Sequence, residues 1–215
     1  MNLALFGGTY DPVHSGHLAA ARSAMDYFSL DQILFVPAGA PPHKPKGQLT
    51  SFAHRYAMVA LACDGEPRFV PSLLEAPEVS SGQPNYAINT VHRIAASLTA
   101  ADHLFYLLGA DAFLDVPHWY KWQELLEACD FIVASRPGFA IEQITQILPE
   151  ELRSGPALVD CIPLRRTKIH LLASVHSDAS SSAIRRLAAA GELLSGWTPL
   201  AVENYICKTK LYGIE

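Results

Sequence analysis

The chain has 215 residues, of which half are hydrophobic and 17% are charged, and its formal net charge is −5 at pH 7. This composition predicts a folded α/β-sized domain with a large buried core, not a disordered chain. A negative balance gives no basic surface for nucleic acid, so a small-molecule partner is favoured. The start of the chain lacks the basic region of a signal peptide, and no apolar run approaches the roughly 18 residues of a membrane span.

The four cysteines are scattered along the chain and form no CxxC pair. This pattern is typical of reduced, mostly buried thiols and argues against a disulfide framework or a structural zinc site. Together with the missing signal peptide, it predicts a cytoplasmic protein without a membrane partner. The oligomeric state stays open, and a homo-oligomer is compatible with the sequence.

Taken in chain order, short apolar runs alternate with segments of helical periodicity. Strands are expected at residues 3–6, 33–36, 104–108 and 131–134, and weaker ones at 68–74 and 168–172. Between the first two strands, apolar residues recur at helical spacing over 18–28, and further helices are expected at 52–62, 87–98, 120–128, 141–148, 181–190 and 199–207. This alternation predicts an α/β fold with a single doubly wound, mostly parallel, Rossmann-like sheet.

One domain over residues 1–215 accounts for the whole chain, with a small helical C-terminal subregion at about 176–215. Two stretches interrupt the alternation. Residues 37–51 are rich in Pro, Gly and Lys and predict a loop. Residues 149–166 mix helix, strand and turn signals, and only a position along one edge of the sheet is suggested for them.

The first strand runs directly into the segment GGTYDPVHSGH, residues 7–17. Gly7 and Gly8 lack the Cβ atoms that would keep a phosphate away from the backbone. His14 and His17 lie three residues apart near a helix start, on one face, where free backbone N–H groups also point. These are the parts that hold a triphosphate. An ordinary turn with incidental histidines is the competing interpretation, and a metal bound by Asp11, His14 and His17 is another, although helical zinc motifs more often use i, i+4 spacing.

The segment GTYDPVHSGH resembles the GTFDPxHxGH signature of the HxGH nucleotidyltransferase superfamily. The doubled glycine and the later blocks are similar to the nicotinate mononucleotide adenylyltransferase branch. Those later blocks follow in the family's order over nearly the whole chain: Pro41-Pro42-His43-Lys44, Asn85-Tyr86-Ala87-Ile88-Asn89-Thr90, Leu108-Gly109-Ala110-Asp111, Trp119-Tyr120, Ser135-Arg136-Pro137-Gly138, Ser180-Ser181-Ser182-Ala183-Ile184-Arg185, and Tyr205-Ile206 with Leu211-Tyr212.

The resemblance implies that ATP and nicotinate mononucleotide react to give nicotinate adenine dinucleotide and pyrophosphate, a step of NAD biosynthesis, by direct in-line attack. His14 and His17 are the implied catalytic residues. Mg²⁺ is expected to accompany ATP, held mainly by phosphate oxygens and water instead of protein ligands. The residues implied to bind ATP and its phosphates are Gly7, Gly8, Thr9, Lys44, Gly109, Asp111, Ser181, Ser182 and Arg185. Those implied to bind the pyridine nucleotide are Thr90, Trp119, Tyr120, Arg55 and Arg136.

Ala179 and Ser182 depart mildly from the family's C-terminal phosphate motif, which usually has a β-branched residue before the serines and often threonine third. Without the first motif, Ser181, Ser182 and Arg185 read as an ordinary helix start followed by a solvated arginine.

Other functions stay open at this point. Related HxGH enzymes use nicotinamide mononucleotide, phosphopantetheine or glycerol phosphate as acceptor, and sequence alone does not settle acid against amide. A nucleotide-binding module without transfer activity is a different class, but the first turn reads GGTYDP and not GxGxxG. A tRNA-linked relative is disfavoured because the chain is short and acidic.

Overall fold

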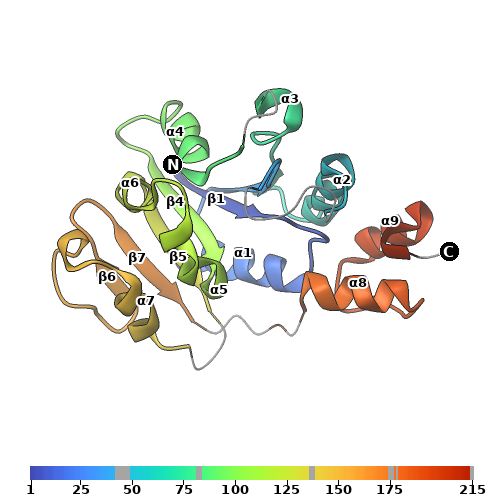
Figure 1. The fold of residues 1–215 in the computed structure, drawn as a ribbon. Helices are drawn as coiled ribbons and strands as arrows, with labels where there is room; N and C mark the ends of the chain where they lie inside the picture. Colours follow the sequence, from blue (N-terminus) through green and yellow to red (C-terminus); the bar gives the residue numbers. More distant parts are fainter. Residues whose placement is uncertain (42–48, 81–83, 136–138, 174–176, 178, 214–215) are drawn as a thin grey trace.

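A seven-stranded sheet forms the centre of the molecule in the order β3-β2-β1-β4-β5-β7-β6 (Figure 1). The computed structural model describes residues 1–41, 49–80, 84–135, 139–173, 177 and 179–213. Neighbouring strands run parallel, except for the antiparallel pair β6 and β7 at one edge. The strands are β1 (Asn2–Gly8), β2 (Gln32–Pro37), β3 (Phe69–Pro71), β4 (His103–Gly109), β5 (Asp130–Ala134), β6 (Cys161–Pro163) and β7 (Lys168–Leu172).

Helices alternate with these strands along the chain. The α-helices of the described part are α1 (Ser15–Tyr27), α2 (Phe52–Cys63), α3 (Pro77–Ser80), α4 (Ala87–Ala95), α5 (Ala110–Leu114), α6 (Trp122–Ala128), α7 (Ile141–Ile147), α8 (Ser181–Ala189) and α9 (Leu200–Thr209). Three 3₁₀ turns are η1 (Val116–His118), η2 (Glu150–Leu152) and η3 (Leu211–Gly213). The expected α/β class and doubly wound sheet are confirmed.

Two hydrophobic clusters cover the two faces of the sheet. Along β1 the side chains alternate, so Ala4 and Phe6 join one cluster while Leu3 and Leu5 join the other. The first cluster takes its helical residues from α1, α2, α8 and α9, and the second takes them from α4, α5, α6 and α7. Figure 1 shows α8 and α9 at one end of the molecule, beside α1, and β6 at the opposite end. The C-terminal helices therefore lie on the same side as the helix that carries the two histidines.

The strand order reverses at β1, because β2 and β3 lie on one side of it and β4 and β5 on the other. In open α/β sheets, ligands bind in the crevice outside the carboxyl ends of the strands at such a reversal. Here that crevice lies between Gly8, which ends β1, and Gly109, which ends β4. The fold thus places the glycine segment where a ligand is expected.

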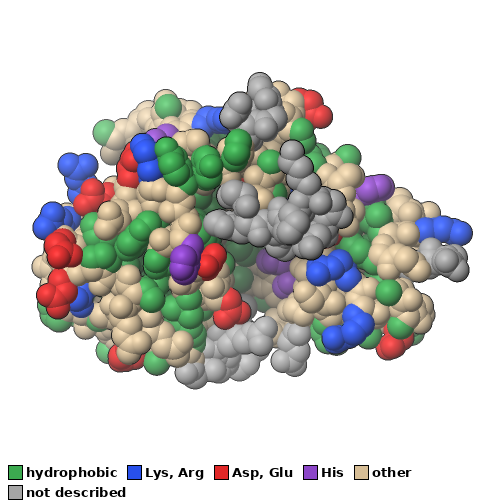
Figure 2. Space-filling view, viewed as in Figure 1, with side chains coloured by type: hydrophobic (Ala, Val, Ile, Leu, Met, Phe, Trp, Pro, Cys, Tyr) green, Lys and Arg blue, Asp and Glu red, His purple; other side chains and the backbone are tan. Residues whose placement is uncertain are grey.

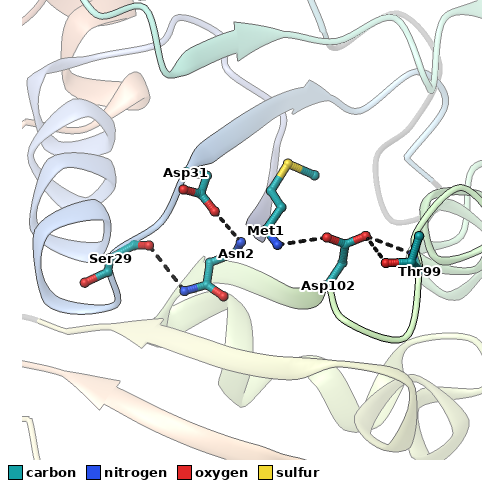
Figure 3. Close-up of polar contacts among 6 residues, drawn as sticks. All are labelled: Met1, Asn2, Ser29, Asp31, Thr99 and Asp102. Atoms are coloured by element: carbon teal, nitrogen blue, oxygen red, sulfur yellow. Dashed lines mark hydrogen bonds and ion pairs between the residues drawn. The ribbon is translucent and has the colours of Figure 1, made fainter.

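Hydrogen bonds fix the amino end of β1, at the end of the sheet opposite the glycine segment. The Met1 ammonium donates a hydrogen bond to Asp102 at 2.8 Å, and Asp102 also accepts from Thr99 (Figure 3). The Asn2 N–H donates to the Asp31 carboxylate, next to the start of β2. These contacts hold β1 in register with its neighbours, so the carboxyl end of β1 is held as well.

The main difference from the expected elements lies in residues 149–166, which the sequence did not assign. They form η2 and the three-residue strand β6, which pairs antiparallel with β7 at the sheet edge. The short helix α5 follows β4 directly and was not expected. Among the described residues, no helix is both long and apolar enough to cross a lipid bilayer. All four cysteines are free thiols, of which Cys63 and Cys129 are buried.

Candidate active site

The last two residues of β1, Gly7 and Gly8, have no room for a side chain. A Cβ atom on Gly7 would lie 2.5 Å from the hydroxyl of Tyr106, and one on Gly8 would lie 3.0 Å from the ring of Tyr10. Tyr10 itself is buried with φ of 50°, and its hydroxyl donates to the Phe6 carbonyl at 2.6 Å. Tyr10 therefore packs against the end of β1 and fixes the turn through its hydrogen bond to Phe6. The two glycines leave the backbone open toward the crevice.

His14 and His17 lie side by side at the start of α1. Their ring centroids are 3.7 Å apart and the ring planes meet at 31°. His17 Nδ1 accepts a hydrogen bond from the His14 backbone N–H at 3.2 Å. A neutral imidazole with an accepting Nδ1 carries its proton on Nε2, so His17 presents an N–H donor on its other side.

The pKa of His17 lies well below its ordinary value, because burial disfavours the charged ring and because His14 adds repulsion. Gly16, between the histidines, has no Cβ that would press on His14: such an atom would lie 3.1 Å from His14 Nδ1. The pair is thus a closely packed unit with a neutral His17.

The late motif at the start of α8 lies directly against this segment. The Ser181 hydroxyl donates to the Pro12 carbonyl at 2.9 Å, and Arg185 donates to the Asp11 carbonyl at 2.7 Å. Arg185 also donates to the Ser182 hydroxyl at 3.3 Å. Figure 2 shows basic side chains gathered over α8 and histidines near the centre of the same face. Two motifs about 170 residues apart in sequence therefore form one site.

A cavity of about 300 Å³ lies beside Gly7, Gly8 and Thr9. That size is at the lower end of small-molecule sites. Gly7, Gly8, Thr9, Trp119 and Tyr120, all expected from the sequence, line it, whereas the histidines and the α8 residues do not. Its further lining residues are Val36, Ala38, Pro41, Glu75, Asn85, Tyr86, Ala87, Tyr106, Leu108 and Ala112.

Aromatic rings form one wall of the cavity. Trp119 meets Tyr106 edge to face at 6.3 Å between centroids, and Tyr86 packs on Tyr120 at 4.4 Å. Such a wall suits a flat aromatic ring. Tyr106 and Tyr86 were not among the residues expected here, since a tyrosine within a buried strand or before a helix looks like core from sequence.

Thr90 does not line the cavity but donates its hydroxyl to Glu75 Oε1 at 2.7 Å. Glu75 also accepts the Gly39 N–H at 3.4 Å. Burial raises the pKa of Glu75, and these two hydrogen bonds partly oppose the rise. The sequence analysis did not select Glu75, whose only signal is an acidic residue placed within an apolar run, LLEA.

The remaining expected residues are spread around this centre. Gly109 precedes α5, and Asp111 lies exposed in its first turn. Arg55 is 2% exposed and donates to three backbone carbonyls, those of Thr50, Thr9 and Ala38, at 2.9, 2.8 and 2.7 Å. Three of its five N–H groups are thus engaged within the protein, where a phosphate contact had been expected. Lys44 and Arg136 lie outside the described residues.

The described part of the chain offers no ligand set for a protein-bound metal ion. Among the described residues, no group of three His, Cys, Asp or Glu side chains is placed to hold a metal ion. The carboxylate of Asp11 accepts from the Tyr212 hydroxyl and from the Thr50 N–H. The alternative in which Asp11, His14 and His17 ligate a metal therefore receives no support from the geometry.

Comparison with known proteins agrees with this arrangement. A cytidylyltransferase-like family model matches residues 5–187. A relative from Solibacter usitatus, named probable nicotinate-nucleotide adenylyltransferase, is 40% identical over 213 residues, covering 99% of this chain and 100% of the relative. A relative of the same name from Gloeobacter violaceus is 38% identical over 215 residues, covering 99% and 96%. Among solved structures, the Plasmodium falciparum nicotinic acid mononucleotide adenylyltransferase complexed with NaAD has a TM-score of 0.73 at 19% identity, covering 100% of this chain and 98% of that one.

The sheet with its reversal at β1 and the match to the cytidylyltransferase-like family model define the chain as a nucleotidyltransferase. Within that class, identity over the full length decides the branch. The chain belongs to the nicotinate-nucleotide adenylyltransferase family.

Proposed function

We propose that this chain is a cytoplasmic enzyme that transfers the AMP moiety of ATP to nicotinate mononucleotide, releasing pyrophosphate and forming nicotinate adenine dinucleotide. The acceptor's 5′-phosphate attacks the α-phosphorus of ATP in line, so the bond to pyrophosphate breaks as the new P–O bond forms. A phosphate monoester has its second pKa near ~6 and is mostly a dianion at neutral pH, so it needs no general base. No covalent intermediate is required.

Catalysis in this scheme rests on bringing two anions together and stabilising the charge on the transferring phosphate. His17 supplies a neutral Nε2–H donor whose direction is set by the bond at Nδ1. A donor fixed before the reaction stabilises developing charge without reorganisation. His14, whose ring centroid lies 3.7 Å from that of His17, contacts the neighbouring phosphate oxygens.

Ser181, Ser182 and Arg185 bind the β- and γ-phosphates at the start of α8, and the free N–H groups of that helix end add further donors. Gly7, Gly8 and Thr9 let the phosphate chain approach the backbone, and Asp111 accepts from ribose hydroxyls at the end of β4. Mg²⁺ arrives on the triphosphate oxygens and lowers their charge when bound. Lys44 and Arg136 stay proposed phosphate contacts from the resemblance.

The cavity lined by Trp119 and Tyr120 receives the pyridine ring of the acceptor. Its aromatic wall offers stacking surface, and Gly7 and Gly8 line it while the histidines do not. A nucleotide bound there extends its phosphate across the turn toward His17. Thr90 acts through Glu75, to which its hydroxyl donates.

The observation that carries this proposal is the contact between the two phosphate motifs, in which Arg185 donates to the Asp11 carbonyl at 2.7 Å. The test is to incubate the purified protein with ATP and Mg²⁺ and to offer nicotinate mononucleotide, nicotinamide mononucleotide or phosphopantetheine separately. Pyrophosphate and the adenylylated product are quantified in each case. Turnover is expected with nicotinate mononucleotide above the other two. Absence of pyrophosphate with every acceptor would overturn the proposal and favour a binding module.

A further inference from the structure

We propose that Tyr212 is a positioning residue for the transfer reaction: its hydroxyl bond to Asp11 holds the segment that carries His14 and His17 in its reactive geometry. The inference rests on the proposed function, because it concerns how the same histidines meet the phosphate. Residues 9–14 are called the histidine loop below.

The starting observation is the environment of Asp11. This carboxylate is 2% exposed, and its two oxygens have separate partners. Oδ1 accepts from the Tyr212 hydroxyl at 2.8 Å, and Oδ2 accepts from the Thr50 N–H at 3.1 Å. A buried carboxylate needs such partners, since leaving it without one costs its full desolvation. The position of Asp11 therefore depends on a residue 201 positions later.

Tyr212 is itself held in one orientation. Its backbone is left-handed, with φ of 66°, and Lys210, which caps α9, has φ of 51°. A non-glycine residue keeps this conformation only where the surroundings fix it. Here Leu211 and Tyr212 pack against the first hydrophobic cluster. The end of the chain thus aims the hydroxyl at Asp11 and does not merely lie near it.

The same C-terminal region contacts three successive residues of the histidine loop, Asp11, Pro12 and Val13. Successive carbonyls of the loop each accept one hydrogen bond from it, and α1 donates one back. These bonds run from Arg185 to the Asp11 carbonyl at 2.7 Å, from Ser181 to the Pro12 carbonyl at 2.9 Å, from Thr198 to the Val13 carbonyl at 3.1 Å, and from the Ser15 N–H to the Trp197 carbonyl at 2.9 Å. Tyr212 supplies the one contact in this set that reaches a loop side chain.

A consequence for catalysis follows from the geometry. Pro12 and Val13 alone separate Asp11 from His14, and the His14 backbone N–H in turn orients His17. A shift of the loop by a fraction of an ångström therefore changes the direction of the His17 Nε2–H. Misplacement of about 1 Å in a catalytic constellation costs on the order of 10²-fold in rate. Binding of either substrate depends on other contacts as well, so the effect belongs mainly to kcat.

The test compares Tyr212→Phe with Tyr205→Phe. Tyr205 is a matched control, because it lies in the same C-terminal region and its hydroxyl bonds a side chain, His54 Nδ1 at 2.9 Å, outside the histidine loop. We expect Tyr212→Phe to lower kcat by about 10-fold or more with KM for both substrates within about twofold, and Tyr205→Phe to keep the parent's kcat. A Tyr212→Phe protein with parental kcat, or equal losses in both variants, would overturn the inference.

A double-mutant cycle separates positioning from general stability. If Tyr212 acts through Asp11, adding Tyr212→Phe to Asp11→Ala causes no further loss of kcat. If the double variant instead loses kcat by the product of the two single-variant factors, the inference is contradicted. Should Tyr212→Phe fail to fold, Thr198→Val removes the bond to the Val13 carbonyl instead, and the same fall in kcat without a rise in KM is expected.

One readout does not depend on turnover. The stacked rings of His14 and His17 shift each other's proton resonances, so their NMR signals report the loop geometry in the free protein. Tyr212→Phe is expected to move both signals, and Tyr205→Phe to leave them in place. If the parent protein is inactive but its histidine signals move in Tyr212→Phe, the proposed function is wrong and the positioning role stands. If the parent is active but Tyr212→Phe changes neither the signals nor kcat, the positioning role is wrong and the proposed function stands.

Discussion

The imidazole rings of His14 and His17 lie 3.7 Å apart between centroids, with their planes only 31° from parallel. Two cations at this separation repel strongly when partly removed from water. Burial and His14 together keep the pKa of His17 well below its usual value. His17 therefore presents a neutral Nε2–H donor, which suits the electrostatic role proposed for it and not proton transfer.

Replacing His17 by alanine tests that role. The loss of a fixed donor to the transferring phosphate is expected to lower kcat by about 10²–10³-fold while the fold is retained. Steady-state kinetics and a thermal melt measure the two quantities. His92→Ala is the control, since His92 is an exposed histidine on α4. Near-parental turnover in the His17 variant would remove this residue from the mechanism.

Trp119→Ala tests the assignment of the cavity. Trp119 supplies stacking surface beside Tyr106, so its loss is expected to raise KM for nicotinate mononucleotide by about 10-fold or more, with a smaller change for ATP. Varying each substrate at saturation of the other gives both constants. Leu193→Ala is the control, because that side chain is 82% exposed. Equal changes in both KM values would indicate a folding defect instead.

The main strands could be predicted from the sequence because each buried strand is a continuous apolar run, as at 104–108 and 131–134. The glycine turn and the paired histidines were accessible for a related reason: their chemistry is local and their spacing fixes one face of α1. Strand β6 was not, since three residues with one buried side chain, Ile162, leave no periodic signal and form by pairing with β7.

Polar contacts between residues far apart in the sequence were the other feature that the sequence could not predict. Asp11 and Tyr212 were both noticed in motif blocks, but no sequence pattern indicates that they meet. The resemblance implies that Arg55 binds the pyridine nucleotide, and only the fold shows it buried and donating to three backbone carbonyls. Glu75 lines the cavity, where Thr90 of α4 and the Gly39 N–H, both distant in sequence, donate to its carboxylate.

Glu75→Gln is expected to increase the preference for the acid over the amide acceptor. Removing a negative charge from the cavity wall helps the ligand with the extra carboxylate, so the ratio of kcat/KM for nicotinate over nicotinamide mononucleotide should rise by about fivefold or more. Glutamine keeps the Oε1 acceptor for Thr90. Glu78→Gln, an exposed change on α3, is the control.

The ratio of kcat/KM for nicotinate over nicotinamide mononucleotide should also depend on pH, in a direction set by the charge of Glu75. Burial raises the pKa of Glu75, so the parent loses this charge as pH falls through the raised value. The parent's ratio should therefore rise toward that of Glu75→Gln at low pH, while the variant's ratio stays flat. The acceptor phosphate titrates equally in both substrates and cancels. A parental ratio that stays constant or decreases as the pH is lowered would contradict the placement of Glu75 beside the ring.

Arg55→Met distinguishes a structural role from substrate contact. Three carbonyls lose a buried donor, and we expect a loss of about 3 kcal/mol or more in the free energy of unfolding, measured by urea denaturation. Arg22→Met, on the exposed face of α1, should change it by no more than about 0.5 kcal/mol. If the Arg55 variant is as stable as the parent but has a raised KM for the acceptor, Arg55 contacts the acceptor and its role is not structural.

Asp130 is a buried residue whose ionisation should contribute to acid stability at the end of the sheet opposite the site. Burial raises its pKa, but hydrogen bonds from His170, the Lys168 N–H and His103 outweigh that effect, and the net pKa is lowered. The Lys168 N–H donates to Oδ1 at 2.7 Å, and His103 Nε2 lies 2.9 Å from Oδ2. Ionised Asp130 thus joins the starts of β4, β5 and β7.

A carboxyl group whose pKa is lower in the folded state stabilises the protein above its unfolded pKa of about 3.9, and this contribution disappears as pH falls through the folded value. Asp130→Asn is therefore expected to lower the free energy of unfolding by about 1–3 kcal/mol at pH 7, and by progressively less below about pH 4. Urea denaturation from pH 7 to pH 3 measures the difference. Asp160→Asn, which alters one exposed bond to Tyr27, should show no such convergence. A difference for Asp130→Asn that stays constant down to pH 3 would show that its charge plays no part and that only packing is lost.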